Sequence, residues 1–149
     1  MNYDQLKLEN QLCFPFYAIS RLIIRAYQDD LDKLGITYPQ YLVMMVLWEH
    51  ETLSVIEIGE KLILNTNTVT PLLKRMELMG LIFRNPSEID QRKVMVSLTE
   101  KGKLMREEAA EIPYKLLKKL DVPTDEDTIA QALALKNKLN NLIERLKDL

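Results

Sequence analysis

The stretch SVIEIGEKLILNTNTVTPLLKRMELMG, residues 54–80, decides the fold. Its apolar residues recur at helical spacing over about 55–63 and again over about 67–79. Each run follows a polar residue that can cap a helix, and Gly80 closes the second run. Two short helices joined by a tight turn are the pattern of a helix-turn-helix motif.

After Gly80 the apolar period changes to two, which predicts strands at 81–84 and 93–98. The polar, proline-containing segment 85–92 between them is expected to form the loop of a hairpin. Longer helical patterns flank this core: about 12–34, then a helix opened by Thr37-Tyr38-Pro39, one from a Thr99 cap to about Leu120, and one from Thr124 to about Lys147.

This order predicts a mainly α fold with a small β-hairpin wing, a winged helix-turn-helix with extra helices at both ends. We expect a single domain over 1–149, with residues 37–99 as the winged part. No apolar run is long enough to span a bilayer, and one cysteine builds no disulfide framework, so we expect a cytoplasmic protein that contacts no membrane.

Charge is distributed unevenly along the chain, although the net charge is only -2. Residues 72–106 carry eight basic and four acidic residues, whereas residues 1–71 carry five basic and nine acidic ones. A basic middle in an acidic scaffold favours a local anion-binding module, as a DNA-binding motif requires.

The start of the predicted second helix of the motif is rich in short polar side chains, which can reach base edges or phosphates in a major groove. Basic side chains one or two turns later can hold the DNA backbone. An arginine at the wing tip suits a narrow minor groove, and Asp90 is expected to orient it. The predicted DNA-binding residues are Thr66, Asn67, Thr68, Thr70, Lys74, Arg75, Arg84, Asp90 and Arg92.

Residues 64–80 resemble the recognition helix of the MarR family of transcription regulators. Asp90-Gln91-Arg92 matches that family's D-x-R wing motif, and residues 97–102 (SLTEKG) match its strand-to-helix junction. The resemblance implies a homodimer whose terminal helices, here about 12–36 and 100–149, interlock, and whose wings straddle a pseudo-palindromic DNA operator. The chain departs from the pattern at Asn65-Thr66-Asn67 and at Pro15, so the operator sequence does not carry over.

The N-terminal segment 8–14 (LENQLCF) is similar to that of the organic-hydroperoxide-sensing branch of the family, and residues 35–42 and 47–53 strengthen the match. The resemblance implies that Cys13 is oxidised to a sulfenic acid, with Tyr27 and Tyr38 of the other subunit as hydrogen-bond donors. Tyr17 is a plausible neighbour, and Phe14 and Phe16 would line an apolar pocket that favours an organic peroxide.

Fast reaction with a peroxide requires a thiolate, so a sensor cysteine needs its charge stabilised. No Lys or Arg lies near Cys13 in sequence, and Glu9 would oppose ionisation. The helix N-terminus and tyrosine hydroxyls are the expected sources of stabilisation. Because the sequence has no second cysteine, we expect the sulfenic acid to pair with a low-molecular-weight thiol, to form a sulfenamide or to oxidise further.

Three other functions compete with a peroxide-released repressor. One is a repressor released by a small aromatic ligand, with Cys13 incidental; another is a helical interaction module that binds no DNA. The third is a thiol peroxidase, which the absence of an Arg or Thr beside the cysteine disfavours. His50 is the only histidine and has no ligand-type neighbours at metal-binding spacing, so we expect neither an enzyme nor a cofactor.

Overall fold

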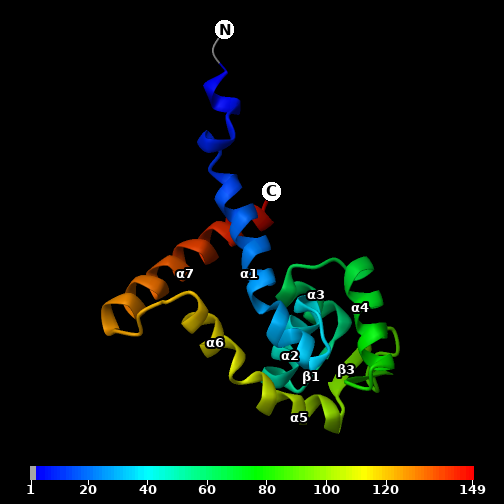
Figure 1. The fold of residues 1–149 in the computed structure, drawn as a ribbon. Helices are drawn as coiled ribbons and strands as arrows, with labels where there is room; N and C mark the ends of the chain where they lie inside the picture. The colour runs from blue at the N-terminus through cyan, green and yellow to red at the C-terminus, as the bar shows by residue number, and fades with distance from the viewer. Residues whose placement is uncertain (1–2) are drawn as a thin grey trace. The chain divides into compact units, whose positions relative to one another are not determined.

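The computed structural model describes residues 3–149 and divides the chain into two compact units, Met1–Ile112 and Pro113–Leu149 (Figure 1). Each unit is described by itself. The first opens with two short 3-10 helices, Asp4–Leu6 and Leu8–Asn10, and then holds α1, Cys13–Leu34. Gly35 ends α1 in the left-handed conformation (φ 69°), which glycine adopts readily at a helix end.

Helix α2, Tyr38–His50, begins with a capping box in which the Gln40 side chain accepts a hydrogen bond from the Thr37 N–H at 2.8 Å. Its apolar residues occur on all sides, and the structure buries the centre of the helix. Tyr41, Val43, Met44 and Leu47 are each 3% exposed or less. The helix predicted after Thr37 is confirmed, and the rest of the winged unit packs around it.

The helix-turn-helix consists of α3, Val55–Leu62, and α4, Thr66–Leu78 (Figure 1). Ser54 caps α3 and Asn65 caps α4, each by accepting a backbone N–H three residues later. The turn between the two helices is tight because Gly59 lies against the backbone of Leu64, where an added Cβ would come within 2.8 Å of the Leu64 carbonyl oxygen. The predicted motif is confirmed.

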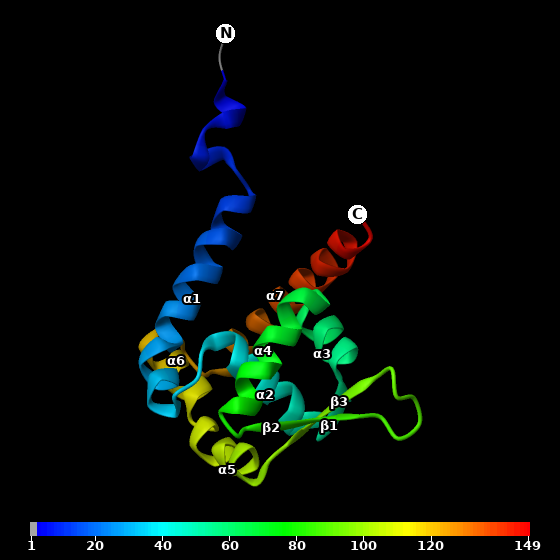
Figure 2. The same ribbon diagram turned by 90° about the vertical axis from the view of Figure 1, so that its right-hand side faces the viewer.

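The sheet has three antiparallel strands in the order β1-β3-β2: β1 Thr52–Ser54, β2 Ile82–Pro86 and β3 Val94–Leu98. Figure 2 shows the β2–β3 hairpin extending away from the helices as a wing. The sequence predicts both hairpin strands but not β1. Strand β1 pairs with β3, Thr52 opposite Ser97, so the wing is anchored by a third strand.

The predicted single helix from Thr99 to about Leu120 is wrong. The structure has α5, Glu100–Ala109, and α6, Ile112–Lys119, separated at residues 110–111. Pro113 is the cause, because a proline inside the helix has no N–H for the carbonyl of Ala109 and its ring clashes there. In α6 the proline occupies the first turn, where it is tolerated.

The last helix, α7, spans Glu126–Lys147 and is capped by Asp125 rather than by the predicted Thr124. None of its residues is buried, although Leu133, Leu142 and Ile143 form part of an apolar stripe along it. Of the helices in residues 3–149, none combines the length and the apolar character that crossing a bilayer requires.

Candidate DNA interface and candidate redox site

The first turn of α4 presents the predicted polar side chains to solvent. Thr66 and Asn67 are exposed, and Thr70 is half-buried one turn later. The Thr68 hydroxyl donates to the Asn65 carboxamide oxygen at 3.0 Å, and the same oxygen accepts the Thr68 N–H. Thr68 is therefore part of the helix cap as well as of the predicted interface.

Four of the nine predicted DNA-binding residues line one cavity of about 220 Å³. The cavity lies between the starts of α3 and α4 and the base of the wing. It is lined by Thr66, Thr70, Arg84 and Arg92, together with others. Sequence reasoning missed Lys93 and Ser54, which line it too; the signal for Lys93 was its place beside Arg92.

Lys74 and Arg75 lie further along α4 and are exposed. The Arg75 Nε donates to the Pro71 carbonyl oxygen at 3.4 Å. Proline at this position places its ring inside α4, so the carbonyl of Asn67 has no i+4 N–H partner. Both basic side chains stand on the solvent side of the helix, outside the cavity.

Arg84 is held in an ion pair. Its Nε and Nη2 donate to Glu77 Oε2 at 3.0 and 2.7 Å, and its backbone N–H donates to Glu77 Oε1. These bonds, together with the charge of Arg84, hold the pKa of the Glu77 carboxyl below its usual value. The pair ties the end of α4 to β2, so Arg84 offers an anion less charge than a free arginine would.

Asp90 organises the wing tip through the backbone. Its carboxylate accepts the Arg92 N–H at 3.1 Å, and its carbonyl accepts the Lys93 N–H at 2.9 Å. The expected contact between the Asp90 carboxylate and the Arg92 guanidinium is not among the interactions of residues 3–149. Arg92 is exposed, and its guanidinium is available to a ligand.

Cys13 is the first residue of α1 and is exposed. The predicted pocket residues Phe14, Phe16 and Tyr17 follow it and are 39%, 44% and 59% exposed, so one chain forms no closed pocket here. Sequence reasoning missed Arg21, whose guanidinium lies 5.5 Å from the centre of the Tyr17 ring. Its i, i+4 spacing from Tyr17 was the available signal.

Tyr27 and Tyr38, the predicted hydrogen-bond donors, pack together with ring centres 5.2 Å apart. Tyr41, which sequence reasoning did not select, joins them at 5.9 and 6.4 Å. Burial, and for Tyr27 and Tyr41 the neighbouring phenols, raises the pKa of all three tyrosines above the ordinary value of 10.0. The phenols therefore stay protonated and able to donate.

The cysteine and the tyrosine pair are not brought together within one chain. Cys13 and Tyr27 lie on the same straight helix fourteen residues apart, which corresponds to roughly 21 Å along its axis. Because a hydrogen bond needs about 3 Å, Tyr27 does not bond to Cys13 of its own chain.

Comparison with known proteins identifies the chain. Residues 25–109 match the family described as Transcriptional regulator SarA/Rot. The Organic hydroperoxide resistance transcriptional regulator of Bacillus subtilis is 51% identical over 97% of this chain and 95% of its own length. The regulator MgrA of Staphylococcus aureus is 40% identical over 83% of this chain and 84% of its own.

Solved structures agree. AbfR of Staphylococcus epidermidis superposes with a TM-score of 0.74 at 38% identity, over 95% of this chain and 97% of that one. Reduced AbfR bound to DNA gives a TM-score of 0.80 at 34% identity, over 98% and 99% of the two chains. These relatives are regulators, which confirms the prediction of a transcription regulator rather than an enzyme. The chain belongs to the MarR/SarA family of winged-helix transcription regulators, in the branch of the organic hydroperoxide resistance regulators.

Proposed function

We propose that the chain is a dimeric transcription repressor that binds a pseudo-palindromic DNA operator and is released when an organic hydroperoxide oxidises Cys13. The observation that carries this proposal is the 51% identity, over 97% of the chain, to a regulator of organic hydroperoxide resistance. The exposed place of Cys13 at the start of α1 supports it, because a peroxide must reach the sulfur.

In the proposed complex, the start of α4 enters the major groove with Thr66, Asn67, Thr68 and Thr70, and Arg92 reaches the minor groove beside it. Lys74, Arg75 and Lys93 hold phosphates, and the cavity between α4 and the wing receives the backbone between the two grooves. Arg84 and Asp90 position the wing rather than contact bases, because both are engaged within the chain. The relative AbfR has been solved bound to DNA, which supports DNA binding by this chain.

The proposed dimer is formed by residues about 12–36 and 100–149. Large apolar side chains on the exposed faces of α1 and α7 support it: Phe16, Ile19 and Leu22 on α1, Leu133, Leu142 and Leu146 on α7. Apolar helix faces of this kind require a second surface. The second copy also supplies Tyr27 and Tyr38 to Cys13, because Cys13 and Tyr27 of one chain lie too far apart on α1 to form a hydrogen bond.

The chemistry follows from the one cysteine. The Cys13 thiolate attacks the outer oxygen of the peroxide, the O–O bond breaks, and the products are a Cys13 sulfenic acid and an alkoxide that takes a proton to become the alcohol. A low-molecular-weight thiol then displaces water from the sulfenic acid and leaves a mixed disulfide. The added bulk at the α1 start shifts the dimer and misplaces the two α4 helices.

A gel-shift experiment tests the proposal. DNA from upstream of the chain's own gene is bound by reduced protein, and cumene hydroperoxide is then added to wild type and to Cys13→Ser. We expect the shift to be lost in wild type and kept in the variant. Equal release of both proteins would reject the cysteine switch, and absence of any binding at low salt would reject the repressor.

A further inference from the structure

A second cavity, of about 500 Å³, lies in the winged unit where the end of α2 meets β1, β3 and the start of α5. Apolar side chains of Leu47, Trp48 and Leu98 form one part of its lining. Charged side chains of Glu51, Lys103 and Arg106 form another. Its volume falls in the range of small-molecule sites, which combine an apolar lining with a few polar groups.

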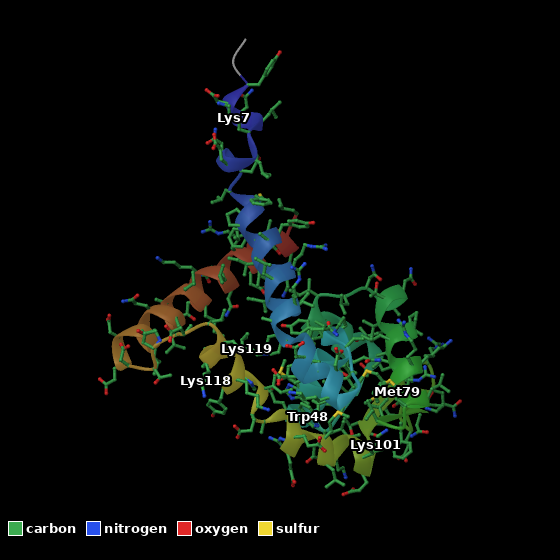
Figure 3. All side chains as sticks on the ribbon, viewed as in Figure 1. Lys7, Trp48, Met79, Lys101, Lys118 and Lys119 are labelled. Carbon is green, nitrogen blue, oxygen red and sulfur yellow. The ribbon has the colours of Figure 1, made fainter. Side chains whose placement is uncertain are left out.

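The Trp48 wall of this cavity is fixed before any ligand arrives. The indole Nε1–H donates to the Gly102 carbonyl oxygen at 2.9 Å, which joins α2 to α5, and Figure 3 shows Trp48 beside that helix. Gly102 in turn lies directly against the Leu81 carbonyl oxygen. A half-buried ring held in this way offers a ligand an ordered apolar surface.

The charges around the cavity do not neutralise one another. Within residues 3–149, neither Glu51 nor Arg106 makes an ion pair, and Lys103 reaches only Glu100, at 3.9 Å between two exposed side chains. An exposed pair at that distance contributes little. One carboxylate and two cations are therefore left to face a common space.

Glu51 is held at the cavity rim by an unusual backbone conformation, φ 60° and ψ -50°. These values lie near the strained γ-turn conformation, which residues other than glycine seldom adopt. Its N–H donates to the Leu47 carbonyl oxygen at 2.9 Å, so the corner between α2 and β1 is closed. This conformation fixes the backbone position from which the Glu51 side chain extends at the cavity rim.

We propose that this cavity binds a free amino acid with an apolar side chain. The ligand carboxylate pairs with Arg106 and Lys103, its ammonium group pairs with Glu51, and its side chain packs on Trp48. A simple carboxylate would leave Glu51 unpaired and close to a like charge, and a simple amine would meet two cations. Only a zwitterion satisfies both signs at once.

Ligand binding is measured by the fluorescence of Trp48, the single tryptophan, on the reduced full-length chain without DNA or peroxide. The probes are L-phenylalanine and L-leucine, with 3-phenylpropanoate and 2-phenylethylamine as analogues that each lack one charge. We expect saturable binding of an amino acid, and binding about tenfold weaker for both analogues, since each loses a charged hydrogen bond. No saturable change with either amino acid, or equal binding of 3-phenylpropanoate and phenylalanine, would overturn the proposal.

Two variants separate the charges. Arg106→Gln is expected to weaken binding of phenylalanine and of 3-phenylpropanoate alike by about tenfold. Glu51→Gln is expected to weaken phenylalanine but to strengthen 3-phenylpropanoate, a gain that damaged folding does not produce. The control Lys61→Gln removes an exposed charge outside the cavity and should leave all affinities unchanged. Loss of 3-phenylpropanoate binding in Glu51→Gln would contradict the assignment, whatever the outcome of the DNA and peroxide experiments.

Discussion

The winged region, α2 to α5, and the terminal helices, the first half of α1 with α7, use their apolar residues in opposite ways. In the winged region Val43, Leu73 and Val96 are completely buried. On the terminal helices Ile19, Leu133 and Leu146 are more than half exposed. The difference indicates that one chain is enough to form the core of the DNA-binding region. The proposed contact between Cys13 and the tyrosines, by contrast, requires two chains.

The largest expected effect lies in the winged region, at Gly102. A Cβ there would collide with the Leu81 carbonyl oxygen, which is backbone and does not move aside, so Gly102→Ala should lower the free energy of unfolding by about 3 kcal/mol. Urea denaturation measures it. Gly80→Ala is the comparison, because open space surrounds Gly80 and only its φ of +70° is strained, at about 1 kcal/mol. Equal losses of stability in the two variants would show that the packing of Gly102 in α5 against Leu81 is not tight.

Next in size is a break in the terminal helices. Leu142→Glu on α7 places a charge in the proposed interface and should raise the dimer dissociation constant about 100-fold. Sedimentation velocity over a concentration series measures this constant. Asn141→Glu adds the same charge about a quarter turn away and should change it little. A Leu142→Glu protein that stays dimeric like wild type would contradict the proposed use of α7.

A substitution of Arg92 tests whether the wing of the winged region contacts DNA. Arg92→Ala should weaken operator binding about tenfold and lower the slope of log affinity against log salt by about one. Fluorescence anisotropy at several salt concentrations gives both quantities. The neighbouring variant Gln91→Ala removes no charge and should keep the slope. An unchanged slope in Arg92→Ala would mean that the Arg92 charge does not contact DNA.

Ile63 is a site of backbone strain inside the winged region. It ends α3 in the left-handed conformation, φ 56° and ψ 43°, although it is β-branched, and its side chain is 57% exposed. Ile63→Gly should therefore raise the free energy of unfolding by about 1 kcal/mol. Ile56→Gly, at a similarly exposed site within α3, should lower it by about the same amount. The same sign in both variants would argue against strain at Ile63.

The smallest effect concerns the tyrosine cluster, which joins α1 to α2. Because the pKa of Tyr27, Tyr38 and Tyr41 is raised above 10.0 in the folded chain, the folded state favours the protonated phenols. Their contribution to stability is complete below the unfolded pKa of 10.0 and is lost as pH rises through the folded pKa values. The urea concentration at the unfolding midpoint should decrease from a pH below 10 to a pH above 10. This decrease should be smaller for Tyr38→Phe than for wild type. Parallel curves would show that the cluster does not sense ionisation.

Most helices and the hairpin could be predicted because their signals are local. Ser54, Asn65 and Thr99 cap helices directly after them, and Gly35 ends one. Strand β1 was missed because three residues carry no readable period and their pairing partner lies more than forty positions away, at β3. The long helix after Thr99 was predicted wrongly because its apolar pattern continues through Pro113, and the missing N–H of that residue outweighs the pattern.

For the candidate sites, too, local features could be predicted from the sequence and long-range contacts could not. The place of Cys13 at a helix start follows from Pro15 in the first turn, and that of Thr66 follows from the Asn65 cap. Neither prediction needs long-range information. The pair between Arg84 and Glu77 was missed because it joins a helix to a strand across a turn, where spacing gives no periodic signal. The packing of Tyr41 on Tyr27 and Tyr38 depends on how α1 crosses α2, which sequence alone does not define.

The hydrogen bonds at the wing tip set the entropy of DNA recognition. Ser87 donates its N–H to the Lys93 carbonyl oxygen at 2.8 Å, and the Asp90 carboxylate and carbonyl tie down the two residues after Gln91. A loop ordered in the free protein loses little conformational freedom when it enters a groove. The wing is therefore preorganised, and a change at Asp90 would weaken the complex without removing any contact to DNA.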